Sequence, residues 1–151
     1  MGCSRIMTAN DFYKLNSRRR RLDKCTVFVL LEMFMGEHGL YEQGWRGEIG
    51  TGEILVDGIE HFPKGCYAGA QCIYEDKLII VAERHTKLST PTEIRDTILH
   101  EIAHVLVGPL GHDNAWAAKA TEIGVRDFHV LNHWLLHYEF PQMRAFMRSS
   151  P

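Results

Sequence analysis

The stretch most informative about the fold runs from Thr90 to Gly108 and has the sequence TPTEIRDTILHEIAHVLVG. Its beginning is typical of a helix start: Thr90 can be the N-cap, a proline takes the first helical position, and Glu93 completes a capping box. Gly108 and the proline after it are typical of a helix end. Apolar side chains recur between these ends at helical spacing, at Ile94, Ile98, Ile102, Val105 and Leu106. We therefore predict one long helix with a buried face.

This predicted helix contains an HExxH motif formed by His100, Glu101 and His104. Histidines four residues apart lie one turn apart on the same helix face, so both imidazoles can reach one ion. Glu101 is displaced by about 100° around the helix and can reach a water molecule beside that ion. We predict zinc ligands at His100 and His104 and a catalytic base at Glu101. The alternative is two surface histidines and a solvated glutamate.

A catalytic zinc site needs a third protein ligand and one open position. His112 is our candidate, because the glycine- and proline-containing turn after Gly108 could fold it back toward His104. A helix-capping or surface role for His112 is the alternative. The metzincin pattern is excluded, since it would need a glycine at Val107 and a histidine at Leu110.

The remaining sequence predicts an α+β fold in which a small sheet, partly antiparallel, follows an N-terminal helix and precedes two helices. Residues 9–21 could open a first helix, and Leu22 to about His38 has helical periodicity. The predicted strands are Trp45 to Ile49, Glu53 to Ile59, and a hairpin of Gly69 to Tyr74 and Lys77 to Ala82. A helix from about Asp113 to Ile123 follows the HExxH helix.

The chain has 151 residues, which suits one domain better than two. We assign that domain to residues 1–124. Residues 125–151 form an apolar and aromatic tail that we expect to pack on the same domain, through a helical stripe of Phe128, Leu131, Leu135 and Tyr138.

Composition favours a soluble protein in a reducing compartment. The four cysteines contain no C-x-x-C pair, which excludes a zinc ribbon, and no apolar segment typical of a secretory signal begins the chain. Apolar runs such as Val27 to Leu31 are far too short to span a bilayer. We therefore expect a location in the cytoplasm, or in the host cytoplasm if the protein is viral, and no membrane partner.

The formal net charge is −2, so the whole molecule has no general attraction for nucleic acid. The first 25 residues nevertheless contain seven basic and two acidic residues, and Arg18, Arg19, Arg20 and Arg21 are consecutive. This arginine cluster is either a solvated basic turn or helix start, or a patch that contacts phosphates.

Taken together, the stretch from Asp96 to Gly108, the Gly111-His112-Asp113 sequence and Trp116 resemble the SprT-like metallopeptidases, whose eukaryotic relative is Spartan. The likeness is greatest to the small SprT-like proteins of phages and bacteria and extends over roughly Leu22 to Gly124. It implies a minimal zincin-like protease fold, a Zn²⁺ site at His100, His104 and His112, and Glu101 as the catalytic residue. It also implies protein or peptide substrates, including proteins attached to DNA, and a role in the repair of DNA–protein crosslinks.

Many relatives continue into a C-terminal zinc ribbon, whereas the tail of this chain has no paired cysteines. Any contact with DNA would then depend on another feature, and the arginine cluster is the candidate. Two other functions stay open. One is a zinc-stabilised interaction or nucleic-acid-binding module without turnover, which a closed fourth coordination position would favour. The other is a three-histidine endoribonuclease of the YbeY-like type, although the third histidine of that family follows more closely than His112 follows His104.

Overall fold

Helix α4 (Pro91–Val107) forms at the predicted place, in a computed structural model that describes residues 6–50, 55–56, 59–60, 70–108 and 114–126. The capping box is confirmed: the Glu93 backbone N–H donates to Thr90 Oγ1 at 3.3 Å, and the Thr90 N–H donates to Glu93 Oε1 at 3.0 Å. Gly108 ends the helix with φ 101°, a value that favours glycine. Both ends of α4 therefore follow from local sequence.

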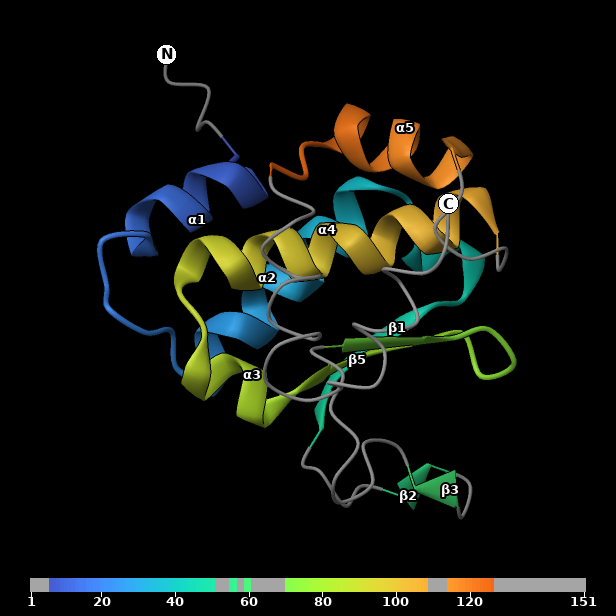
Figure 1. Ribbon diagram of the computed structural model, residues 1–151, viewed down its shortest axis with the longest axis horizontal. Coiled ribbons are helices and arrows are strands. Elements are labelled where there is room, and N and C mark those ends of the chain that lie inside the picture. The colour runs from blue at the N-terminus through green and yellow to red at the C-terminus, as the bar shows by residue number, and fades with distance from the viewer. Residues whose placement is uncertain (1–5, 51–54, 57–58, 61–69, 109–113, 127–151) are drawn as a thin grey trace, which may run out of the picture.

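A three-stranded sheet lies beside α4 (Figure 1) and has the strand order β1 (Arg46–Gly50), β5 (Leu78–Ala82), β4 (Ala70–Ile73). Strands β4 and β5 are antiparallel, which confirms the predicted hairpin. Strand β1 pairs with β5 in parallel, with Arg46 opposite Leu78 and Gly50 opposite Ala82. The sheet is thus mixed, and its parallel pair was not predicted.

A second, two-stranded ladder pairs β2 (Leu55–Val56) with β3 (Ile59–Glu60) in antiparallel fashion. Leu55 lies opposite Glu60, and Val56 lies opposite Ile59. The prediction of one continuous strand from Glu53 to Ile59 was therefore wrong. Apolar periodicity alone did not reveal that this segment pairs with itself.

The predicted N-terminal helix is two helices, α1 (Ala9–Asn16) and α2 (Lys24–Glu37). The second helix has its own N-cap, Asp23, whose carboxylate accepts a hydrogen bond from the Thr26 backbone N–H at 2.7 Å. This cap starts α2 separately from α1. A short 3₁₀ turn, η1 (Tyr41–Gln43), precedes β1. Helix α5 (Asn114–Ile123) confirms the second helix after the motif, and Gly124 with φ 106° follows it.

Helix α3 (Glu83–Leu88) was not predicted. It has six residues and no side-chain hydrogen bond at its N-cap, Ala82, so it lacks both a long periodic pattern and a start signal. It follows β5 directly and brings the chain to the start of α4.

One large core lies between the helices and one face of the sheet. Helix α2 packs on β1, while α4 packs on β4 and α5 (Figure 1). Ile79 and Val81 of β5 face this core, whereas Leu78, Ile80 and Ala82 form a smaller cluster, as the alternation of side chains along a strand requires. The molecule is therefore α+β, and its central helix is packed on both sides.

Val125 is buried in the main core. The rest of the predicted tail, residues 127–151, lies outside the described residues, as do Cys66 and His112. In the described part of the chain, every helix is too short or too polar to cross a bilayer.

Candidate metal centre

His100 and His104 lie on successive turns of α4 and face each other. Their ring centroids are 5.0 Å apart and their planes are inclined at 65°. Both side chains are half-buried, so they are neither sealed in the core nor fully in solvent. This histidine pair has the spacing and the nitrogen chemistry of two ligands to one Zn²⁺ ion.

Glu101 lies between the two histidines in sequence but is buried, with 7% of its surface exposed. Burial raises the pKa of its carboxyl group to about 8, because the charged form loses its hydration. A carboxyl group with such a raised pKa is typical of acid–base sites. The sequence predicted the position of Glu101 on the helix but not this burial.

Trp116 of α5 closes one side of the histidine pair. Its ring centroid is 4.6 Å from that of His100 and 5.3 Å from that of His104, and it is stacked on His104 with an interplanar angle of 26°. Its indole Nε1 donates a hydrogen bond to the His100 carbonyl oxygen at 3.3 Å. The tryptophan thus contacts both predicted ligands.

Tyr74, just after β4, approaches the same turn of α4 from the sheet. Its hydroxyl group donates to the His104 carbonyl oxygen at 2.8 Å, and its ring packs edge-on against Trp45 at 5.7 Å. These contacts attach the end of the motif helix to the sheet edge. Tyr74 was not predicted from the sequence, although its place at the end of the predicted hairpin strand was a usable signal.

Cys72 of β4 lies near Glu101. Burial raises the pKa of its thiol to about 12, and the nearby Glu101 carboxyl group adds to the rise. Burial and the neighbouring Cys72 also raise the pKa of Tyr74. Both groups therefore stay protonated at neutral pH, so Cys72 is not an activated nucleophile there.

The third predicted ligand, His112, lies outside the described residues. Within the described ranges, no group of three or more histidine, cysteine, aspartate or glutamate side chains is placed to hold a metal ion. The described residues therefore fit two of the ligands of a zinc site, and a third donor stays a prediction at His112.

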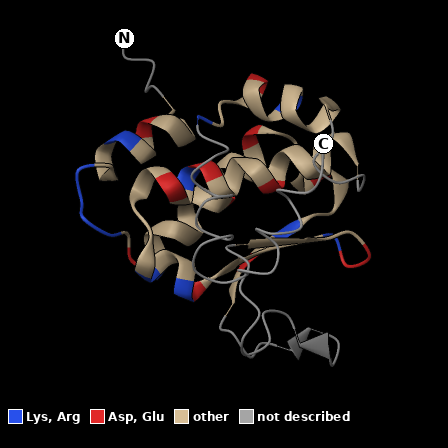
Figure 2. Ribbon diagram, viewed as in Figure 1, with Lys and Arg blue, Asp and Glu red and all other residues tan. Residues whose placement is uncertain are grey.

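The arginine cluster, Arg18 to Arg21, is exposed and lies in the turn between α1 and α2 (Figure 2). Arg19 pairs with Asp23 at 3.2 Å, and Arg21 Nε donates to the Lys87 carbonyl oxygen at 3.3 Å. This turn lies at the opposite side of the molecule from the C-terminal half of α4 (Figure 1). The structure does not bring the arginine cluster to the histidine pair.

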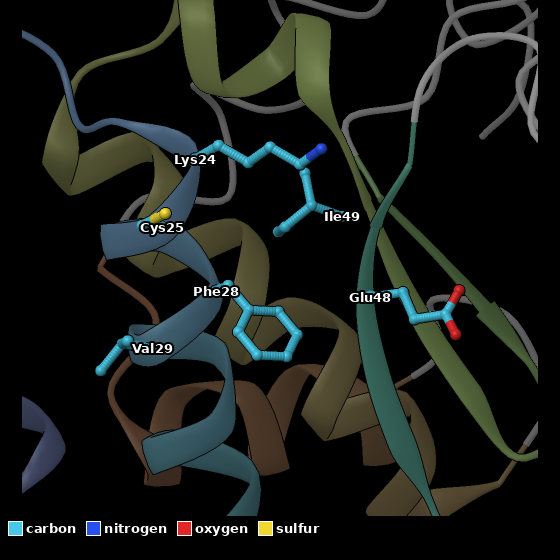
Figure 3. Close-up of a pocket in the computed structure, with 6 residues that line it drawn as sticks. All are labelled: Lys24, Cys25, Phe28, Val29, Glu48 and Ile49. Carbon is cyan, nitrogen blue, oxygen red and sulfur yellow. The ribbon is translucent and has the colours of Figure 1, made fainter.

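A groove of about 520 Å³ lies between α2 and β1 (Figure 3). Phe28 of α2 points into it, toward β1. The described residues that line it are mostly apolar, and none of them is a predicted site residue: Lys24, Cys25, Phe28, Val29, Glu48 and Ile49. The groove is thus separate from the candidate metal centre.

Comparisons of the chain with models of known protein families, with curated proteins and with solved structures found no match.

Proposed function

We propose that this protein is a zinc-dependent metallopeptidase of the SprT-like kind, with a minimal zincin-like fold. The observation that carries the proposal is the histidine pair on α4, whose rings lie 5.0 Å apart beside the buried carboxyl group of Glu101. His100, His104 and His112 would hold the ion and leave one coordination position open.

The proposed reaction adds water across a peptide bond, so that hydroxide joins the carbonyl carbon and a proton joins the departing nitrogen. Zinc, when bound, would polarise the carbonyl, acidify the attacking water and lower the pKa of the Glu101 carboxyl group. Glu101 in its ionised form accepts the water's proton and then passes it to the leaving amine. Its burial keeps bulk water from competing for that proton.

The proposed substrates are proteins or peptides, including proteins held on DNA. The exposed arginine cluster supports this extension, because it supplies a concentrated positive charge away from the metal centre (Figure 2). DNA bound at this turn would bring attached proteins near the molecule without occupying the histidine pair.

The test compares wild-type protein with Glu101→Gln, both loaded with Zn²⁺, on a basic DNA-binding protein with and without single-stranded DNA. We expect Glu101→Gln to bind zinc like the wild type and to cleave at least ~100-fold more slowly, because it lacks the proton acceptor. Glu122→Gln is the matched control, since Glu122 is an exposed residue of α5 whose partner is Lys119.

Equal cleavage by the wild type and Glu101→Gln would refute the proposed mechanism. Failure of all three proteins to cleave, with zinc bound, would favour a non-catalytic zinc module. Cleavage of RNA without cleavage of protein would favour an endoribonuclease.

A further inference from the structure

Trp116 is in an unusual position for a core residue, because one ring contacts both predicted ligands. The indole lies 4.6 Å from the ring centroid of His100 and 5.3 Å from that of His104. The two contacts differ in geometry, with interplanar angles of 61° and 26°. The same surface therefore restricts both imidazoles, and in different orientations.

The indole is itself held in place. It is 5% exposed, and its Nε1–H donates to the His100 carbonyl oxygen at 3.3 Å, on the turn of α4 that carries the first histidine. Helix α5 packs along α4 in this region (Figure 1). Trp116 is thus a fixed support that joins α5 to the histidine pair.

Two histidines on a helix can bind one ion only when both rings adopt suitable rotamers together. An unrestrained imidazole samples several rotamers, and the loss of this freedom opposes metal binding. A neighbouring ring that restricts both imidazoles beforehand removes part of that loss. Groups that orient metal ligands in this way commonly change metal affinity when they are replaced.

We propose that Trp116 is a positioning residue that orients His100 and His104 for binding of one metal ion. This inference rests on the proposed function, since it assigns Trp116 to the same metal centre. Trp116 acts through the two imidazoles and takes no part in the transfer of protons.

The first test measures Zn²⁺ affinity of the metal-free full-length protein by competition with a chelating dye. We expect Trp116→Leu to weaken zinc binding by about 10- to 100-fold. Trp116→Phe keeps an aromatic surface but loses the indole donor, and it should restore most of that loss. Phe34→Leu is the matched control: it removes another buried aromatic ring, whose contact is with Arg95, and should lower stability without changing zinc affinity.

If folded Trp116→Leu binds zinc within about twofold of the wild-type affinity, the inference is overturned. Replacing a group that orients metal ligands typically lowers metal affinity by about 10- to 100-fold. Two comparisons separate positioning from general destabilisation. Trp116→Phe should recover zinc affinity, whereas Phe34→Leu should lose stability but keep its zinc affinity. If His104→Ala binds zinc as well as the wild type, the proposed metal centre itself is wrong, and the inference fails with it.

The second test does not require a Trp116 variant to fold. The chain has three tryptophans, so Trp45→Phe combined with Trp134→Phe leaves Trp116 as the sole indole. Co²⁺ bound at the histidine pair should quench its fluorescence in proportion to occupancy, because the indole lies against both ligand rings. Histidine-dependent Co²⁺ binding that leaves this emission unchanged would overturn the inference.

Discussion

His85 shows how one buried side chain links stability to pH. It is 1% exposed and lies between two hydroxyl groups, with Nδ1 2.9 Å from Ser89 Oγ and Nε2 2.7 Å from Thr97 Oγ1. Burial lowers its pKa from 6.5 to about 4, because the charged ring would lose its hydration. His85 therefore has a structural role, as a neutral ring held between two hydroxyl groups in the core.

This lowered pKa predicts a loss of stability in acid. Between pH 6.5 and about 4 the unfolded chain binds a proton at His85 that the folded chain does not, so the free energy of unfolding falls as the pH falls. The contribution from this one group is at most about 3 kcal/mol. Urea unfolding of metal-free protein at pH 7 and pH 4.5 measures it.

His85→Gln keeps a polar side chain but removes the titration, so its stability should fall less steeply over the same pH range. The two proteins share every other titratable group, and the difference between their slopes therefore isolates His85. Parallel slopes would show that His85 does not titrate as its burial requires.

At the level of elements, the contact between α2 and β1 depends on a glycine. A Cβ atom at Gly47 would lie 2.7 Å from Leu31 Cδ2 and 2.8 Å from Met35 Sδ. Both of these side chains are fully buried and cannot move into solvent. The absence of a side chain at Gly47 therefore lets helix and strand approach closely.

Gly47→Ala should accordingly lower the free energy of unfolding by about 1–3 kcal/mol through overpacking. Gly36→Ala is the control within α2, where the new Cβ would meet the Tyr41 ring at 3.6 Å, an ordinary contact. That change should be neutral or stabilising by up to about 1 kcal/mol, because alanine favours helix. Chemical denaturation of both variants measures the two changes in the free energy of unfolding. A Gly47→Ala variant as stable as the wild type would contradict the close packing.

For the whole molecule, zinc binding should stabilise the fold. A ligand that binds only the folded state at 100 times its Kd raises the free energy of unfolding by about 2.7 kcal/mol. Thermal unfolding with and without Zn²⁺ should therefore show a higher Tm for the wild type and for Glu101→Gln. His100→Ala and His104→Ala should lose this increase, and an unchanged increase in either would contradict their role as ligands.

The arginine cluster permits a second whole-molecule prediction. Arg19 and Arg21 donate hydrogen bonds within the protein, so changes at Arg18 and Arg20 test DNA contact with less disturbance of the fold. The double variant Arg18→Ala, Arg20→Ala should bind single-stranded DNA more weakly. The slope of log affinity against log salt concentration should become shallower, by the amount expected for the loss of about one to two phosphate contacts. Fluorescence anisotropy across a salt series measures both quantities.

Arg46→Ala with Arg126→Ala removes the same charge from two exposed positions outside the cluster. This control should retain most of the DNA affinity. Equal losses in the two double variants would mean that net charge, rather than the cluster, governs binding.

Signals that act within a few residues were predictable from sequence. The capping box of α4, the glycine that ends it and the β4–β5 hairpin depend on neighbours close in the chain, and all three are confirmed. The separation of His100 and His104 by four residues likewise determined that they share a helix face. Where the local signals were weak, the prediction was wrong: α3 was not predicted, and the break between α1 and α2 was missed.

Contacts between distant segments could not be predicted from the sequence. The parallel pairing of β1 with β5, the hydrogen bond from Tyr74 to His104 and the packing of Trp116 against both histidines join segments whose contact no short sequence pattern specifies. The burial of Glu101, which raises its pKa, also arises from this packing. The side chains that share a face of α4 were thus predictable, because helix geometry is local. The environment of those side chains was decided by the path of the whole chain, because solvent exclusion depends on everything packed around them.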